Sequence, residues 1–210
     1  MTIKSFFSLE RELIDKPFLF DDFLGNTLNG EGLWTLSSVG AAPALLTGVT
    51  GGQLSMSSGP DNISALNPVG FGISGGTTLT FESRFKRNAS YAPSRAWFGF
   101  ADSTTWNGPS NAIILDMQAD GGNWKAVTTS GGTSTTTDTG VAGTNSWQKL
   151  KVVATSTSVA FYIDDVLKAT HTTNIPTAKL GVCVSLYRTP QNTTMQTIDY
   201  IMASSSVRNN

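Results

Sequence analysis

The chain has 210 residues, enough for one large domain or two small ones with a buried core. Charged residues make up only 14% of it, against roughly 25% in ordinary soluble domains, while it holds 28 Thr, 23 Ser and 21 Gly. These residue types favour strands and turns over helices. The net charge of −1 excludes a dominant electrostatic surface for nucleic acid or for an anionic membrane.

Cysteine and histidine occur once each, which excludes several kinds of disulfide and metal site. Cys183 is the sole cysteine and His171 the sole histidine, which excludes an internal disulfide, a cysteine-based zinc site and a histidine-rich metal centre. We therefore expect no metal and no cofactor. We find neither a Sec-type signal nor an apolar run of about 18 residues, so we expect synthesis in a host cytoplasm and no membrane partner.

Residues 1–17 differ from the rest of the chain. Their apolar side chains recur at helical spacing, and Pro17 ends the stretch, so we expect a short amphipathic arm. Two interpretations remain open: the arm packs on its own domain, or it docks on a neighbouring subunit. The residues that would dock are Phe6, Phe7, Leu9, Leu13 and Ile14.

From Phe18 onward, apolar and polar residues alternate with a period of two between turn residues, which predicts half-buried strands. Many short strands without a convincing helix indicate an all-β, two-sheet antiparallel sandwich. Residues 128–143 are expected to form an exposed hairpin or a long loop. The predicted strands cover 33–39, 53–58, 79–86, 95–101, 112–119, 123–129, 147–155, 159–163, 180–187 and 198–202, with a further strand that ends at His171.

The buried core should come from the apolar face of each strand. It is predicted to contain Trp34, Phe81, Phe85, Trp147, Leu150, Val152, Phe161, Ile163, Val182, Val184 and Tyr200.

The order of these signals resembles the concanavalin A-like jelly roll of legume lectins, laminin-G-like modules and family 16 glucanases. The resemblance rests on residues 20–23 followed by Trp34, and on the closing half from Trp147 to Ile201. Members usually carry Asp-Gly in a hairpin where this chain has Asp164-Asp165. The resemblance covers about residues 18–205, which we expect to form a jelly-roll domain between the N-terminal arm (1–17) and a short tail (206–210). It implies no single function, because this fold hosts enzymes, lectins and scaffolds.

Glucanases of this fold carry three acids on alternate positions of one strand, and two of them perform the chemistry. The one comparable place here is Asp116, Gln118 and Asp120, where the middle residue cannot titrate. We therefore expect no catalytic centre. A Ser-His-Asp triad would need His171, which we interpret instead as a solvated strand histidine. Cys183 lies in mid-strand and is interpreted as a structural thiol.

The sequence offers candidate residues for two kinds of ligand site. Six aspartates could offer oxygens to calcium, but no calcium-loop motif is present, so we expect no metal site. Trp106 lies in a predicted loop and is the candidate for stacking on a glycan. The aspartates are Asp21, Asp22, Asp102, Asp164, Asp165 and Asp199.

The sequence is compatible with three functions from different classes: a structural protein, a binding module and an enzyme. Phage structural proteins resemble this chain in being rich in hydroxyls and glycine, low in charge and without an export signal. We expect a virion structural protein, namely a capsid decoration (cement) subunit that forms a homotrimer on the major capsid protein or on other virion subunits. The alternative is a glycan-binding module of a tail fibre or adhesin that recognises surface glycans. The remote alternative is a glycoside hydrolase.

Overall fold

A computed structural model describes residues 18–24, 34–38, 43–57, 63–73, 75–87, 94–103, 108–117, 122–188 and 195–206. The predicted arm and residues 207–210 lie outside these ranges. The described residues form fifteen strands and no helix, and so none of them crosses a membrane as a helix. The strands are β1 (Phe18–Asp21), β2 (Thr35–Ser38), β3 (Ala44–Leu45), β4 (Leu54–Ser57), β5 (Ile63–Phe71), β6 (Leu79–Arg87), β7 (Ser94–Ala101), β8 (Ala112–Met117), β9 (Asn123–Ser130), β10 (Thr133–Ala142), β11 (Gln148–Ala154), β12 (Val159–Ile163), β13 (Val166–His171), β14 (Leu180–Arg188) and β15 (Met195–Ser205).

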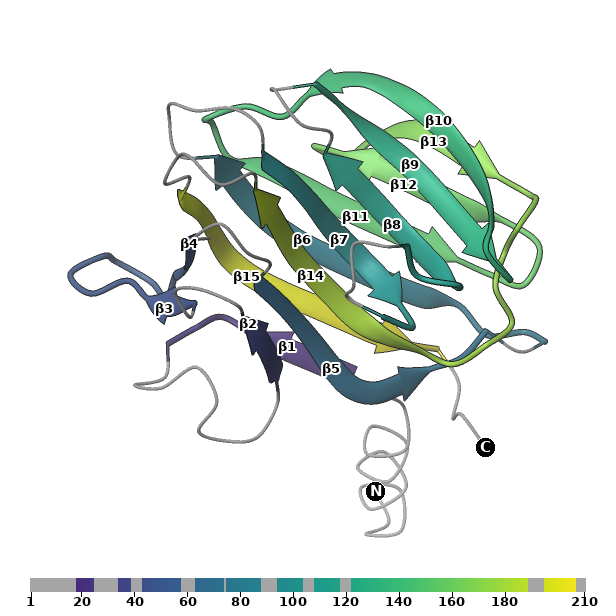
Figure 1. The fold of residues 1–210 in the computed structure, drawn as a ribbon, viewed down its shortest axis with the longest axis horizontal. Coiled ribbons are helices and arrows are strands. Elements are labelled where there is room, and N and C mark those ends of the chain that lie inside the picture. Colours follow the sequence, from purple (N-terminus) through teal and green to yellow (C-terminus); the bar gives the residue numbers. More distant parts are fainter. Residues whose placement is uncertain are drawn as a thin grey trace, which may run out of the picture.

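The strands form two antiparallel sheets packed face to face (Figure 1). The eight-stranded sheet has the order β13-β12-β11-β6-β15-β4-β3, and β1 also pairs with β15. The seven-stranded sheet has the order β10-β9-β8-β7-β14-β5-β2. About half of the neighbouring strands in each sheet are not consecutive in sequence, because the chain crosses between the two layers, for example from β6 to β7 and from β10 to β11. This is the all-β, two-sheet antiparallel sandwich that the alternation predicts.

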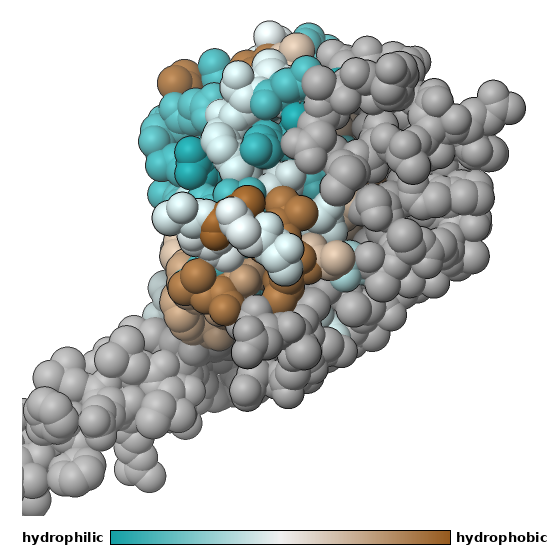
Figure 2. Space-filling view, turned by 90° about the vertical axis from the view of Figure 1, so that its left-hand side faces the viewer, coloured by the Kyte–Doolittle hydropathy of each residue, from teal (hydrophilic) through white to brown (hydrophobic). Residues whose placement is uncertain are grey.

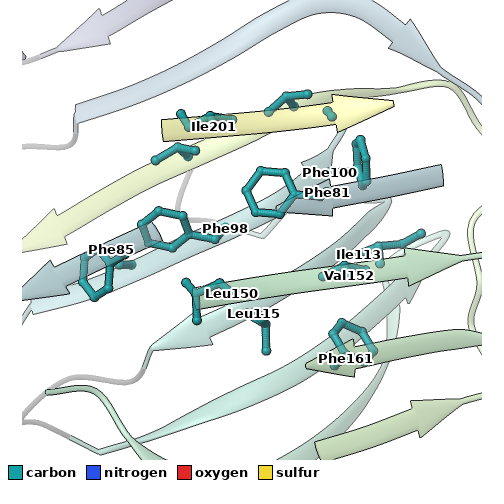
Figure 3. Packing of buried hydrophobic residues seen from close by; sticks show 14 of the residues in the cluster. Phe81, Phe85, Phe98, Phe100, Ile113, Leu115, Leu150, Val152, Phe161 and Ile201 are labelled. Carbon is teal, nitrogen blue, oxygen red and sulfur yellow. The ribbon is translucent and has the colours of Figure 1, made fainter. Parts of the chain in front are cut away.

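Aromatic rings from both sheets fill the space between them (Figure 3). Phe85 of β6 packs edge-on against Phe98 of β7, with 4.9 Å between ring centroids. The ring of Trp124 lies 5.5 Å from that of Phe85, and its indole Nε1 donates to Oε1 of buried Gln148 at 3.2 Å. Burying such rings contributes about 1.5–3 kcal/mol each, so this cluster is a main source of stability. Nine of the eleven predicted core residues are buried: Trp34, Phe81, Phe85, Leu150, Val152, Phe161, Ile163, Val182 and Val184.

The predicted burial of Tyr200 and Trp147 is wrong. The pairing of β15 with β6 shifts register between Ile198 and Tyr200. A one-residue bulge moves every following side chain to the other face of its sheet. Ile201 therefore points into the core, while Tyr200 lies half-buried on the outer face and donates its hydroxyl hydrogen to Glu82 at 2.7 Å.

Trp147 precedes β11 and is also half-buried on the outer side. The cationic ends of Arg84 and Lys86 each lie 4.7 Å from its ring centroid. Cations are attracted to the electron-rich face of an indole ring, so this tryptophan is held by charged neighbours and not by the core.

The strand β5 was not predicted, because Pro68 and Gly70 interrupt its sequence. Proline has no N–H to donate and is confined to places where a strand lacks a partner on one side. Among the described residues, β2 pairs only with residues 63–66 of β5, so no described strand lies beside Pro68 on that side. The register between β5 and β14 also shifts beside this proline.

Two tight hairpins close neighbouring strands. Gly131 and Gly132 join β9 to β10, and both have positive φ (56° and 80°), as a type I′ turn requires. Residues 128–143 thus belong to a hairpin, one of the two predicted alternatives. Asp164 and Asp165 join β12 to β13 in the same way, with φ of 51° and 63°, so the departure from Asp-Gly leaves the hairpin intact.

Candidate functional site

A hollow of about 460 Å³ lies on the outer face of the seven-stranded sheet. Its floor comes from Trp97 of β7, Ile114 of β8 and Val127 of β9. Residues 108–110, between β7 and β8, and Gly132 of the β9–β10 turn contribute to its wall. The hollow has the size of a small-ligand site, and strands position its floor.

Strand alternation explains why apolar residues lie here, outside the main core. Phe98 and Phe100 of β7 point between the sheets, so Trp97 and Ala101 point to the outer face. There they form a second cluster with Ala112, Ile114 and Cys183. Gly99 keeps β7 close to β8, because a Cβ at this position would lie 2.2 Å from the carbonyl oxygen of Ile113.

An ion pair lies in the hollow beside this floor. Nε of Arg95 donates to Asp116 Oδ1 at 2.9 Å, and Nη2 of Arg95 bonds Oδ2 of the same carboxylate. The Asp116 side chain is only 3% exposed and that of Arg95 is 37% exposed. The hydrogen bond to Asp116 raises the pKa of Arg95. The guanidinium carbon also lies 5.5 Å from the centroid of the Trp97 ring.

Hydroxyl groups line the other part of the hollow. Thr129 of β9 and Ser134 of β10 share a hydrogen bond of 2.8 Å, and Ser110 lies in the loop that faces them. Just outside the hollow, Lys125 and Asn123 bond the carboxylate of Asp138. The bond from Lys125 and the backbone N–H of Gly140 lower the pKa of Asp138 to about 2. The hollow thus combines an apolar floor, a paired cation and anion, and hydroxyl groups that bond one another.

The structure places one of the glucanase-like acids in this hollow. Asp116 is there, while Gln118, Asp120 and the stacking candidate Trp106 lie outside the described residues. Among the described residues that line the hollow, Asp116 is the sole carboxylate. Sequence reasoning missed Arg95 and Trp97. Their signal was present, since an arginine and a tryptophan alternate with the two core phenylalanines of β7.

The interpretation of His171 as a solvated residue is wrong. His171 is 3% exposed and joins the edges of the two sheets. Its Nδ1 lies 3.0 Å from Thr128 Oγ1, and its Nε2 lies 2.9 Å from Thr137 Oγ1. Thr128 gives its hydroxyl hydrogen to the carbonyl of Thr173, so Nδ1–H must donate to Thr128 while Nε2 accepts from Thr137. Burial lowers the pKa of this histidine, consistent with a neutral ring.

Cys183 is fully buried in the second cluster, and burial raises its pKa to about 12. A thiol with such a pKa stays protonated and is a poor nucleophile. Its surroundings agree with the structural role predicted for it.

The aspartates considered for calcium serve other purposes. Asp21 accepts from the indole of Trp34 at 2.7 Å, Asp199 pairs with Arg84 at 3.0 Å, and Asp165 pairs with Lys149 at 2.6 Å. Within the described part of the chain, no three His, Cys, Asp or Glu residues gather in a way that could hold a metal ion.

Solved structures with the same fold include carbohydrate-binding and carbohydrate-cleaving proteins. A Bacillus licheniformis beta-glucanase has a TM-score of 0.64 at 15% identity, over 89% of this chain and 97% of the glucanase. The Lotus tetragonolobus seed lectin has a TM-score of 0.61 at 9% identity, over 92% and 100%. The carbohydrate recognition domain of Emp46p, in its metal-free form, gives 0.62 at 13% identity, over 87% and 93%. At these identities the likeness shows the fold, and it confirms the concanavalin A-like jelly roll.

Sequence comparison places the chain more specifically. The search of curated proteins found no match. The family model described as SO2946-like, C-terminal domain, matches residues 47–202, which span most of the chain and nearly all of both sheets. The protein therefore belongs to the SO2946-like C-terminal domain family.

Proposed function

We propose that this domain binds a glycan in the hollow on the seven-stranded sheet and does not cleave it. The observation that carries the proposal is the paired Arg95 and Asp116 beside an apolar floor and a row of hydroxyls. A sugar ring presents an apolar face and a rim of hydroxyl groups. The hollow matches the hydroxyl rim best, because the ion pair supplies donors and acceptors in fixed positions. For the apolar face it offers mainly half-buried Val127, since Trp97 and Ile114 are each only 3% exposed.

The structural neighbours support this choice of ligand, since their names include a lectin, a carbohydrate recognition domain and a beta-glucanase. The charge of the hollow supports a neutral glycan. Arg95 and Asp116 balance each other, so the described lining residues carry no net charge. A strongly anionic or cationic ligand would leave one partner of this pair uncompensated.

The absence of cleavage is inferred from the state of Asp116. Glycoside hydrolysis by the common route needs two carboxyl groups flanking the bond, one as acid and one as base or nucleophile. Both oxygens of Asp116 accept hydrogen bonds from Arg95, so attack by this carboxylate would first break a mostly buried ion pair. Incubation with β-glucans and bacterial polysaccharides should release no sugar. Hydrolysis that Asp116→Ala abolishes would overturn this part of the proposal.

Binding is tested by screening the protein on a glycan array and titrating the strongest ligand calorimetrically. Ser134→Trp should fill the hollow and weaken binding at least tenfold without leaving a buried charge unpaired. Arg95→Gln should weaken binding similarly, while Arg84→Gln, which removes a more exposed ion pair on the eight-stranded sheet, should not. The proposal fails if no glycan binds or if Ser134→Trp binds as tightly as the wild type.

We further infer that the domain belongs to a virion structural protein, namely a capsid decoration subunit that contacts the major capsid protein. One structural observation favours this assembly role. Four apolar side chains are exposed on β1 and on the segments that follow β1 and β3: Phe18 (61%), Phe20 (50%), Leu24 (67%) and Val49 (40%). We call them the N-terminal patch. Apolar residues gather on the side of the molecule that carries β3 and β4 (Figure 2).

The patch continues the apolar character of residues 1–17 in the sequence, because Phe18 directly follows Pro17. Beside it is a smaller hollow of about 170 Å³, where Phe20 and Tyr200 lie with 6.4 Å between ring centroids. Exposed apolar side chains that gather on one side of a protein commonly mark an interaction site. A capsid subunit docked here would cover the patch and the arm together.

Sedimentation with undecorated capsids tests this role. Deletion of residues 1–16, or the double change Phe18→Ser and Phe20→Ser, should reduce co-sedimentation. The matched control is Val166→Ser with Leu167→Ser, which removes two other exposed apolar side chains, from β13. Full occupancy by the truncated protein would show that the arm belongs to its own domain.

A further inference from the structure

The two sheets end in edge strands of very different length. The strands β3, β2 and β1 have two, four and four residues, and β13 has six. Among the described residues, the edge strand β10 has ten residues and pairs within its sheet only with β9. Its Thr135 and Thr137 side chains bond His171 and the segment that follows it, but these bonds do not use the outward backbone groups. A long unpaired edge offers its backbone groups to another chain, and proteins usually protect such edges with lysine, proline or a bulge.

The first six residues of β10 carry none of these protective features. They run Thr133-Ser134-Thr135-Thr136-Thr137-Asp138, and their register with β9 is regular. The bulge begins only after Asp138. All six side chains except Thr135 are exposed. This segment, which we call the β10 edge, is therefore regular, accessible and uninterrupted.

The geometry of the Gly131-Gly132 turn determines which backbone groups of the β10 edge do not pair with β9. In a type I′ turn the N–H of the fourth residue bonds the carbonyl of the first, so the N–H of Thr133 faces Ser130 of β9. Backbone groups alternate in direction along an antiparallel strand. Ser134, Thr136 and Asp138 therefore direct their N–H and C=O groups away from β9, toward the open side of the sheet.

We propose that the β10 edge pairs with the β10 edge of a second copy of this chain, about a twofold axis at Thr136. In this antiparallel register, Thr136 faces Thr136 of the second copy, and Ser134 faces Asp138 of the second copy. Each of these facing pairs exchanges both backbone N–H···O bonds, so every free group of the segment finds a partner.

The side chains are complementary in the same register. The two Asp138 carboxylates lie apart, since each faces a serine hydroxyl that can donate to it. Thr136 faces its own copy, and threonine pairs are favourable across strands. No like charges meet, and Lys125 already neutralises Asp138 at 2.7 Å. The β10 edge therefore suits a second copy of itself better than a charged or strongly apolar partner.

The contact would join the two seven-stranded sheets into one continuous sheet, with both hollows on the same outer face. It lies far from β1 and the N-terminal patch, so a subunit could use both surfaces (Figure 1). The pairing does not depend on glycan binding. If the hollow also binds glycan, two linked sites gain affinity for repeated polymers without any new contact.

Analytical ultracentrifugation of the full chain tests the pairing. The wild type should sediment as a dimer at tens of micromolar. Thr136→Lys should sediment as a monomer with an unchanged circular dichroism spectrum, because it places like charges on the axis. Thr157→Lys, an exposed substitution in the β11–β12 turn, should remain dimeric. A monomeric wild type at these concentrations, or a dimeric Thr136→Lys, would overturn the proposal.

Oxidative cross-linking tests the register independently of any fold defect. Hydrogen-bonded pairs in an antiparallel ladder have Cα atoms about 5.5 Å apart, which suits a disulfide. Thr136→Cys should therefore form a covalent dimer on mild oxidation. Ser134→Cys should not, because the two positions would lie about 14 Å apart along the strands. The native Cys183 is fully buried and takes no part. Equal yields from both variants would refute the register.

Discussion

The contribution of the Arg95–Asp116 ion pair to the free energy of unfolding can be measured by substitution. The change is Arg95→Met, which removes the cation and leaves a carboxylate that is 3% exposed without its main donor. Removing one partner of a buried pair costs about 3–5 kcal/mol. Because the Arg95 side chain is 37% exposed, solvent screens part of the interaction, and we expect a loss of about 2–3 kcal/mol in the free energy of unfolding.

Comparison of the double variant with the two single variants separates the interaction energy of the Arg95–Asp116 pair from the other effects of each substitution. Asp116→Leu should cost about 1–2 kcal/mol, since the remaining Arg95 can still reach water. Arg95→Met combined with Asp116→Leu removes both charges, so it should cost less than Arg95→Met alone. The assay is urea unfolding followed by tryptophan fluorescence and extrapolated to water.

The matched control is the exposed pair Arg84–Asp199, whose side chains are 45% and 25% exposed. Its loss through Arg84→Met should cost less than about 1 kcal/mol. If Arg95→Met and Asp116→Leu prove additive within about 0.5 kcal/mol, the pair carries no coupling energy and the reasoning is refuted.

Three further outcomes are expected. Phe161→Ala should lower the free energy of unfolding by about 3–5 kcal/mol, because Phe161 is fully buried and packs on His171; Phe161→Leu, measured beside it, should cost clearly less. Since burial lowers the pKa of His171, the neutral form stabilises the fold above pH 6.5, and stability should fall as pH drops below that value. Denaturant midpoints between pH 5.5 and 7 should lose this slope in His171→Gln, and an unchanged slope would contradict the assignment. Asp165→Gly should raise the melting temperature, because glycine adopts the positive φ of 63° without the strain of about 1 kcal/mol that a side chain causes. The substitution removes only an exposed ion pair with Lys149, which contributes little. A lower melting temperature would show that the pair outweighs the strain.

Local sequence determined the strands and most of the core. Alternation along residues 79–86, 159–163 and 180–187 assigned each side chain to a face, because a strand's side chains alternate whatever the strand pairs with. The same alternation predicts which residues of the hollow point to the outer face of the sheet. Trp97 had to face away from Phe98, and Asp116 had to face away from Leu115.

Tertiary structure decided where alternation breaks and which faces meet. The bulge near Asp199 reversed the face of Tyr200, and it depends on pairing with β6, which no local pattern encodes. His171 is buried because β13 meets β10 at the end of the sandwich, although its threonine neighbours in sequence suggest a solvated strand.

The hollow itself is likewise a property of the assembled sheet. Arg95 and Asp116 are 21 residues apart in sequence and become partners only because β7 and β8 are adjacent and in register. Alternation is a property of one strand, so the sequence alone could predict which way each of these side chains points. Contact between them requires the pairing of two strands, and that pairing is set by the packing of the whole sandwich.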